Sequence, residues 1–173
     1  AVLITYANTV TDDAAFGLQS LRGLVNRHLE PFARVIHVLP FLKSTSDGGF
    51  AVSSYQTIQQ EYGDWSDLSA LAEGRRLMAD LVLNHVSASH PWVQQFLRNE
   101  QPGESCVLEA SPDPCWNDVV RPRSSALFTQ LSGPNGRRQV WTTFGPDQVD
   151  LDWHHPQVLL GFIELLNRLL SHG

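Results

Sequence analysis

The stretch Asp80-Leu81-Val82-Leu83-Asn84-His85 carries three apolar residues that run directly into a polar Asn-His pair. A strand buried in a parallel sheet reads as a continuous apolar run, and in α/β proteins the functional side chains stand where such strands end. The stretch therefore predicts a buried strand, with Asn84 and His85 at the edge of the sheet where a site would form.

Two strand-helix pairs are predicted before this stretch. Apolar runs at 2–4 and 35–39 predict strands, and apolar residues at helical spacing over 18–29 predict a helix. Ser66 is expected to cap a second helix, which ends before Gly74. Strands that alternate with helices predict an α/β protein with a parallel sheet. Three strands fit the start of a closed eight-stranded barrel as well as an open doubly wound sheet.

The pattern changes after Ser87. A short helix is predicted from Pro91, and residues 99–152 are rich in Pro, Gly and Ser, with short β-prone pieces such as 140–144. This composition indicates a subdomain inserted into the strand-helix alternation. A final helix is predicted to open near His155-Pro156, because apolar residues recur on one face after it.

Composition excludes several classes of function. With 173 residues, 42% hydrophobic and 17% charged, the chain fits one soluble globular domain, and its net charge of -6 without a basic stripe argues against a nucleic-acid partner. No apolar run reaches the roughly 18–20 residues of a membrane span. We expect a cytoplasmic protein with no membrane partner. Cys106 and Cys115 are too few for a disulfide framework.

Several stretches, taken in order, resemble glycoside hydrolase family 13, the α-amylase superfamily, and within it the sucrose phosphorylase branch. Residues 80–87 are similar to the superfamily's first conserved region, at the end of the third barrel strand. The other similar stretches are 3–7, 37–41, 47–50, 62–68, 121–123, 140–144 and 148–152. The resemblance covers nearly the whole chain.

The resemblance implies a partial (β/α)8 barrel. Residues 1–99 would form its first part, with strands one to three, and residues 100–152 would form the small inserted domain B. Residues 153–173 would be the third barrel helix, and the remainder of the barrel would be absent.

The resemblance also implies a reaction. A sucrose phosphorylase converts sucrose and phosphate to glucose 1-phosphate and fructose by retaining α-glucosyl transfer, which needs two carboxyl groups about 5 Å apart. In the family, the nucleophile Asp and the acid/base Glu come from strands four and five. We therefore expect this chain to carry sugar-binding residues but neither catalytic carboxylate, and to be inactive alone.

Four residues are expected to bind the sugar by this resemblance. His85 matches a histidine that hydrogen-bonds the glucosyl unit, and Asp47 matches an aspartate that accepts from glucosyl hydroxyls. Phe50 matches an aromatic platform for the sugar, and Tyr6 ends the first strand, where it could reach the pocket. The alternatives are a buried structural His85, a turn role for Asp47 before two glycines, and core packing for the two aromatic residues.

Arg121 and Arg123 are expected at the acceptor side, where a guanidinium pairs well with phosphate oxygens. A solvent-exposed loop pair is the alternative. Val120 stands where sucrose phosphorylases commonly carry Tyr, which puts the acceptor in question. We expect no metal, because six to eight oxygen ligands for calcium cannot be assembled around Asn84. We also expect no cofactor, with phosphate as the co-substrate.

Two other functions stay open on the sequence alone. One is an α-glucosidase or amylase-like hydrolase, in which water takes the glucosyl group. The other is a non-catalytic half-barrel that forms a homo-oligomer or complements a second chain, because a truncated sheet exposes an edge. The expected small-molecule partners are an α-glucoside or sucrose-like sugar and phosphate.

Overall fold

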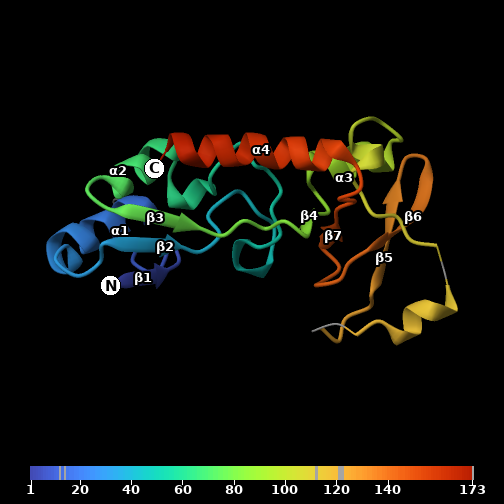
Figure 1. Cartoon of the computed structure of the whole chain (residues 1–173), viewed down its shortest axis with the longest axis horizontal. Helices are drawn as coiled ribbons and strands as arrows, with labels where there is room; N and C mark the ends of the chain where they lie inside the picture. Colours follow the sequence, from blue (N-terminus) through green and yellow to red (C-terminus); the bar gives the residue numbers. More distant parts are fainter. Residues whose placement is uncertain (12, 14, 112, 121–122, 173) are drawn as a thin grey trace. The chain divides into compact units, whose positions relative to one another are not determined.

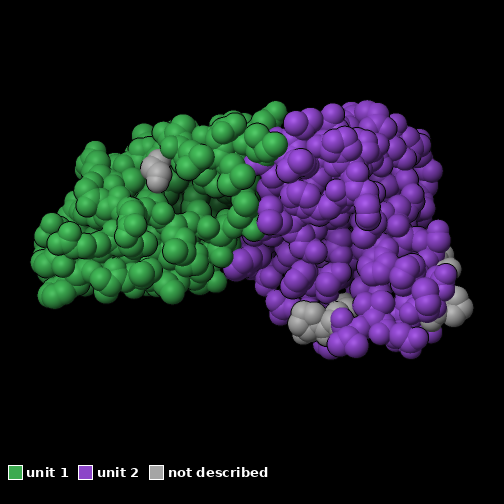
Figure 2. Space-filling view, in the orientation of Figure 1, with its two compact units in different colours: residues 1–44, 54–81, 163–173 green, residues 45–53, 82–162 purple. Residues whose placement is uncertain are grey.

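The computed structural model describes residues 1–11, 13, 15–111, 113–120 and 123–172 (Figure 1). The chain forms two compact units, which Figure 2 colours green and purple. Unit 1 comprises Ala1–Ser44, Ser54–Leu81 and Ile163–Gly173, and unit 2 comprises Thr45–Ser53 and Val82–Phe162. In the described part of the chain, none of the helices has the length and apolarity that crossing a bilayer requires.

Unit 1 contains a parallel sheet of three strands in the order β1-β2-β3, shown side by side in Figure 1. Helices separate the strands along the chain, so the prediction of an α/β arrangement with parallel strands is confirmed. Buried side chains of the first helix and of the middle strand supply much of the core. The elements are β1 (Val2–Thr5), α1 (Gly17–Leu24), a π-helical continuation (Val25–Leu29), β2 (Val35–Val38), a 3-10 turn (Gln60–Tyr62), α2 (Trp65–Ala72) and β3 (Arg76–Ala79).

The third strand lies earlier than predicted. β3 ends at Ala79, and residues 80–84 form no ladder, with Asn84 exposed. Ala79 pairs with Val38, so two residues further on the partner would be Pro40, which has no N–H to continue the ladder. The prediction of a buried strand over 80–83 was therefore wrong.

The start of α2 also differs from the prediction. Asp64, not Ser66, is the N-cap, and its Oδ1 accepts from the backbone N–H of Ser66 at 2.8 Å and of Asp67 at 3.2 Å. The Asp67 carboxylate accepts in return from the Asp64 N–H at 3.0 Å. This reciprocal capping box satisfies backbone donors that a helix start leaves unpaired, which favours the earlier start.

Unit 2 is built from short antiparallel ladders and helices. β4 pairs with β7, and β5 pairs with β6. The predicted helices from Pro91 and near Pro156 are confirmed, and the β-prone piece at 140–144 ends its ladder at Trp141. The elements are 3-10 turns (Asp47–Gly49, Gly103–Ser105 and Pro114–Asp118), β4 (His85–Ser87), α3 (Pro91–Leu97), β5 (Phe128–Gly133), β6 (Gly136–Trp141), β7 (Gln148–Asp150) and α4 (Pro156–Ser171).

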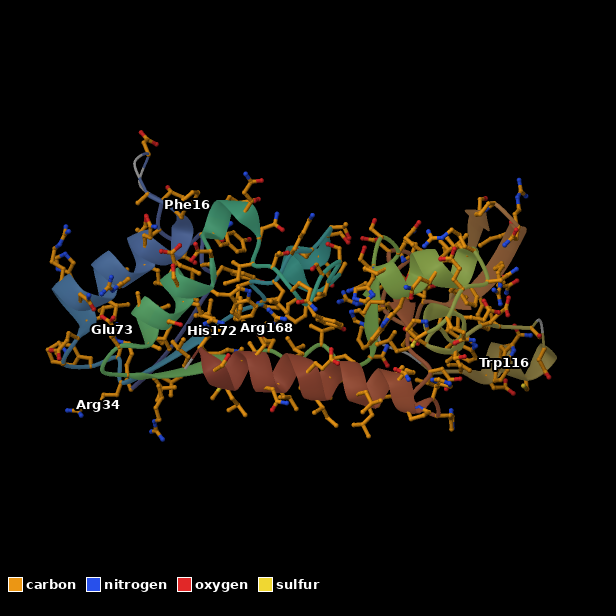
Figure 3. All side chains as sticks on the ribbon, turned by 90° about the horizontal axis from the view of Figure 1, so that it is seen from above. Phe16, Arg34, Glu73, Trp116, Arg168 and His172 are labelled. Atoms are coloured by element: carbon orange, nitrogen blue, oxygen red, sulfur yellow. The ribbon has the colours of Figure 1, made fainter. Side chains whose placement is uncertain are left out.

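The last part of α4 belongs to unit 1 and packs on α2. Figure 3 shows Arg168 and His172 on the side of α4 that faces α2. The His172 ring stacks on Trp65 with centroids 4.9 Å apart, and Ser69 Oγ lies 3.0 Å from His172 Nδ1. Arg168 donates to the Gln56 side-chain oxygen at 2.5 Å. Stacking and side-chain hydrogen bonds thus fix the end of this helix.

Two glycines provide a matched test of local packing. A Cβ on Gly103 would lie 2.9 Å from the Trp92 carbonyl carbon and 2.5 Å from Cβ of Gln95, whereas a Cβ on Gly23 would have no neighbour within 4 Å. We expect Gly103→Ala to lower the free energy of unfolding by about 1–3 kcal/mol through overpacking. Gly23→Ala in α1 should raise it by roughly 0.5–1 kcal/mol. Urea unfolding of both variants checks this, and equal effects would contradict it.

Candidate functional site

The site is built on the β4–β7 ladder of unit 2. His85 is paired with Asp150 and Ser87 with Gln148, so these four side chains share one face of the ladder. His85 and Gln148 are diagonal neighbours, which are within reach of long side chains. All four residues are buried. Four buried polar groups in one short ladder need hydrogen-bond partners, and the partners come from loops around it.

The turn Asp47–Gly49 supplies one of those partners. Asp47, Gly48 and Gly49 have φ values of 54°, 61° and 102°, so three consecutive residues are left-handed. The backbone N–H of Phe50 closes the turn on the Asp47 carbonyl at 3.1 Å. Glycine adopts this conformation freely, whereas at Asp47 the left-handed conformation destabilises the fold by about 1–2 kcal/mol. Such a cost persists when the surrounding contacts impose it, and it often marks a functional position.

A chain of hydrogen bonds connects the turn to the ladder. Gln148 Nε2 donates to Asp47 Oδ2 at 2.9 Å and lies 3.1 Å from His85 Nε2. The contact with Asp47 fixes the orientation of the Gln148 side-chain amide, since only its NH₂ group can donate to a carboxylate. The second amide hydrogen then points at His85, so His85 Nε2 must accept. The geometry therefore assigns His85 the neutral tautomer with its proton on Nδ1.

Burial acts on His85 in the same direction. Its side chain lies in unit 2 beside the Phe144 ring, with centroids 5.1 Å apart. Burial lowers the pKa of His85 below its ordinary 6.5, while Asp150, the nearby Phe50 backbone and Asp47 raise it. The lowered pKa keeps His85 neutral at pH 7, as its contact with Gln148 requires.

Asp150 forms the other side of the site. Asn84 Nδ2 donates to Asp150 Oδ1 at 2.9 Å, and both the N–H and the hydroxyl of Thr143 donate to the same carboxylate. Burial raises the pKa of Asp150, and the hydrogen bonds from Thr143, the field of His85 and the bond from Asn84 oppose that rise. These donors hold the carboxylate next to His85.

The structure brings three of the six predicted sugar and acceptor residues together. Asp47, His85 and the backbone of Phe50 meet in unit 2, and the role of the Phe50 ring stays a prediction. Tyr6 belongs to unit 1, follows β1 and is 37% exposed, and its role in the site stays a prediction. Arg123 is exposed and precedes β5, while Arg121 lies outside the described residues. The role of the arginines also stays a prediction.

Sequence reasoning missed Gln148 and Phe144 as site residues. Both fall in stretches that match the family, but no role was assigned to either. The available signal was the alternation Gln148-Val149-Asp150, which puts two polar side chains on one face of a short strand. Their contacts are invisible in a local pattern, because Gln148 lies 101 residues from Asp47 and 63 from His85.

Among the residues that the structure describes, no three His, Cys, Asp or Glu side chains cluster so as to hold a metal ion. The Asn84 amide is engaged with Asp150. Cys106 is buried and Cys115 is exposed, and both are free thiols.

Comparison with known families decides the identity. Residues 32–173 match the family described as alpha amylase, catalytic domain. The chain belongs to the α-amylase family. This is glycoside hydrolase family 13, so the family resemblance noted in the sequence is confirmed.

Curated relatives of this α-amylase-family chain include phosphorylases. It is 42% identical over its full length to a glucosylglycerate phosphorylase of Allomeiothermus silvanus, covering 31% of that protein. It is 31% identical, over 96% of its length, to a sucrose phosphorylase of Agrobacterium vitis, covering 36% of that protein. The chain thus spans about a third of the length of these curated relatives.

Structural comparison supports the same fold. The crystal structure of sucrose 6F-phosphate phosphorylase from Thermoanaerobacter thermosaccharolyticum superposes with a TM-score of 0.91 at 24% identity, over 99% of this chain and 37% of that one. At this identity the likeness establishes the fold of the α-amylase-family chain and not its substrate.

Proposed function

We propose that this chain is the glucosyl-recognising part of a retaining α-glucosyl phosphorylase. The observation that carries the proposal is the Asp47–Gln148–His85 chain of hydrogen bonds, built on a left-handed turn. Asp47 is exposed, so a sugar hydroxyl can donate to its carboxylate. Gln148 holds that carboxylate in place and is itself held by His85, as a site with rigid recognition of hydroxyls requires.

The fold proposal is a partial (β/α)8 barrel. The parallel order β1-β2-β3 is the order in which such a barrel begins, and α4 would be its third helix. Residues 1–99 would supply strands one to three, residues 100–152 domain B and residues 153–173 that helix. The β5–β6 hairpin within 100–152 is consistent with a separate inserted domain.

The bond-breaking groups are proposed to lie on further strands. The family resemblance places the nucleophile Asp and the acid/base Glu on strands four and five, and the sheet of unit 1 has three strands. Retaining transfer needs both carboxyl groups, about 5 Å apart across the scissile bond. This chain would therefore bind and orient the glucosyl unit, and the other strands would carry out the transfer.

The acceptor is proposed to be phosphate, bound with the help of Arg121 and Arg123. Arg123 is exposed, and a guanidinium presents a fork of donors that matches two phosphate oxygens. For the donor sugar, glucosylglycerate is a second candidate besides sucrose, because the identity to the glucosylglycerate phosphorylase is 42% and to the sucrose phosphorylase 31%.

We expect the 173-residue chain alone to give no phosphorolysis of either sugar. We expect activity when the chain replaces the matching third of the Allomeiothermus silvanus glucosylglycerate phosphorylase, because the chimera regains the catalytic carboxylates. The measurement is phosphate-dependent loss of glucosylglycerate or sucrose, with glucose 1-phosphate as the expected product.

Three outcomes would contradict parts of this proposal. Turnover by the chain alone would overturn the assignment of the catalytic carboxylates to other strands. Release of glucose by the chimera without phosphate would favour the hydrolase. A folded chimera that loses sugar binding would show that this chain does not recognise the glucosyl unit.

A further inference from the structure

A second carboxylate, next to Gln148 in sequence, binds the two residues that precede the Asp47 turn. Asp147 Oδ2 accepts from Thr45 Oγ1 at 2.5 Å and from Ser46 Oγ at 2.7 Å. Asp147 Oδ1 accepts from the backbone N–H of Ala88 at 3.2 Å. One side chain thus ties residues 45 and 46 to the segment that follows β4.

The hydroxyls around Asp147 form a single directed network. Thr45 has one hydroxyl hydrogen, and its short contact to Asp147 uses it. Ser87 Oγ, 2.7 Å from Thr45 Oγ1, must then be the donor in that pair, and it also lies 3.3 Å from Asp147 Oδ1. Ser87 Oγ accepts in turn from the Ser89 N–H at 3.0 Å. These donor and acceptor assignments require both carboxylate oxygens of Asp147 to act as hydrogen-bond acceptors.

The start of the turn is therefore attached by two consecutive residues, Asp147 and Gln148. Asp147 binds residues 45 and 46, and Gln148 binds Asp47. At the second of these attachments, Asp47, the backbone enters the left-handed conformation. A strained residue is held in place only when its surroundings over-determine it, and the two attachments provide that constraint.

We propose that Asp147 is a positioning residue for the sugar site. It holds Thr45 and Ser46 so that Asp47 keeps its carboxylate on Gln148, and Gln148 in turn keeps its amide hydrogen on His85. Asp147 does not itself touch the sugar. The effect on sugar binding rests on the proposed function, whereas the effect on His85 does not.

The test compares Asp147→Asn with Asp118→Asn in the full 173-residue chain. Asn keeps the shape of Asp147 but replaces one acceptor oxygen by a donor, so one hydroxyl or N–H loses its partner. Asp118 lies in the turn Pro114–Asp118 and is exposed, and its replacement changes the net charge equally. The same comparison is repeated with Thr45→Val, which removes the hydroxyl, and Thr45→Ser, which restores it.

The first readout is the tautomer of His85 by ¹⁵N NMR of its ring, assigned with His85→Gln. We expect the Nδ1–H tautomer alone in the wild type, Asp118→Asn and Thr45→Ser, and a mixture of tautomers in Asp147→Asn and Thr45→Val. A single unchanged tautomer in both Asp147→Asn and Thr45→Val would overturn the proposal. A general loss of stability would not by itself change the tautomer, so thermal unfolding of each variant is recorded alongside.

The second readout is the affinity for methyl α-D-glucopyranoside by calorimetry or NMR titration. We expect Asp147→Asn to weaken binding about tenfold, and Asp118→Asn to leave it unchanged. Unchanged affinity in Asp147→Asn, with measurable binding by the wild type, would overturn the positioning of the sugar site. If the wild type binds no glucoside, the proposed function fails, and the tautomer of His85 still decides whether Asp147 positions the turn.

Discussion

Asp47→Asn is expected to weaken binding of methyl α-D-glucopyranoside by about 10- to 100-fold, because hydrogen bonds from sugar hydroxyls to a charged acceptor contribute about 1.5–3 kcal/mol. The substitution removes the negative charge of Asp47 and leaves the shape of the side chain nearly unchanged. Asn adopts left-handed backbone conformations as Asp does, so the φ of 54° is retained. The Asn carbonyl oxygen can still accept from Gln148. Titration of the probe into both proteins measures the change.

Stability provides the control for this variant. Asn keeps the bond from Gln148 but removes the charge of its acceptor, so the replacement should lower the free energy of unfolding by about 1 kcal/mol. Asp118→Asn, which carries the same charge change at an exposed position, should bind the probe as the wild type does. Equal affinities of the wild type and Asp47→Asn would remove Asp47 from the sugar site.

The regular elements with strong local signals were predictable from the sequence. β1 and β2 follow from short apolar runs, and α3 and α4 follow from a proline at the first helical turn with apolar residues at helical spacing. In each case the signal lies within the element itself. The family resemblance extended this local information to the order of the elements.

β3 could not be placed from its own residues. The apolar run at 81–83 is a stronger strand signal than Arg76–Ala79, yet the ladder forms on the latter. The position is decided by the partner strand, because β2 is followed by Pro40 and offers no donor beyond it. Strand position here depends on pairing between segments, which a single-segment pattern does not contain.

The site was predictable in its family-matched residues only. Asp47 and His85 were chosen by resemblance, and the structure joins them through Gln148, which lies 101 residues from Asp47 in the chain. Asp147 contacts Thr45 at a separation of 102 residues. Polar networks of this kind arise from the fold, so their members carry no distinctive local pattern.

Lowering the pH from about 6.5 to about 4 is expected to reduce the free energy of unfolding by about 3 kcal/mol because of His90 alone. His90 is 4% exposed and caps α3, with Nδ1 accepting the Trp92 N–H at 3.2 Å. Burial lowers its pKa from 6.5 to about 4, so between these values the unfolded chain binds the proton and the folded chain does not. The stabilisation is complete above pH 6.5 and is lost as the pH falls towards 4. Urea unfolding across this pH range measures it.

His90→Asn separates this contribution from the others. Asn is a good N-cap and does not titrate, so the helix start is kept while the proton linkage is removed. His85, whose pKa burial also lowers, remains in the variant, so a smaller loss of stability in acid should persist. If His90→Asn lost as much stability in acid as the wild type, the neutral, buried cap at His90 would be excluded as the source of the acid sensitivity.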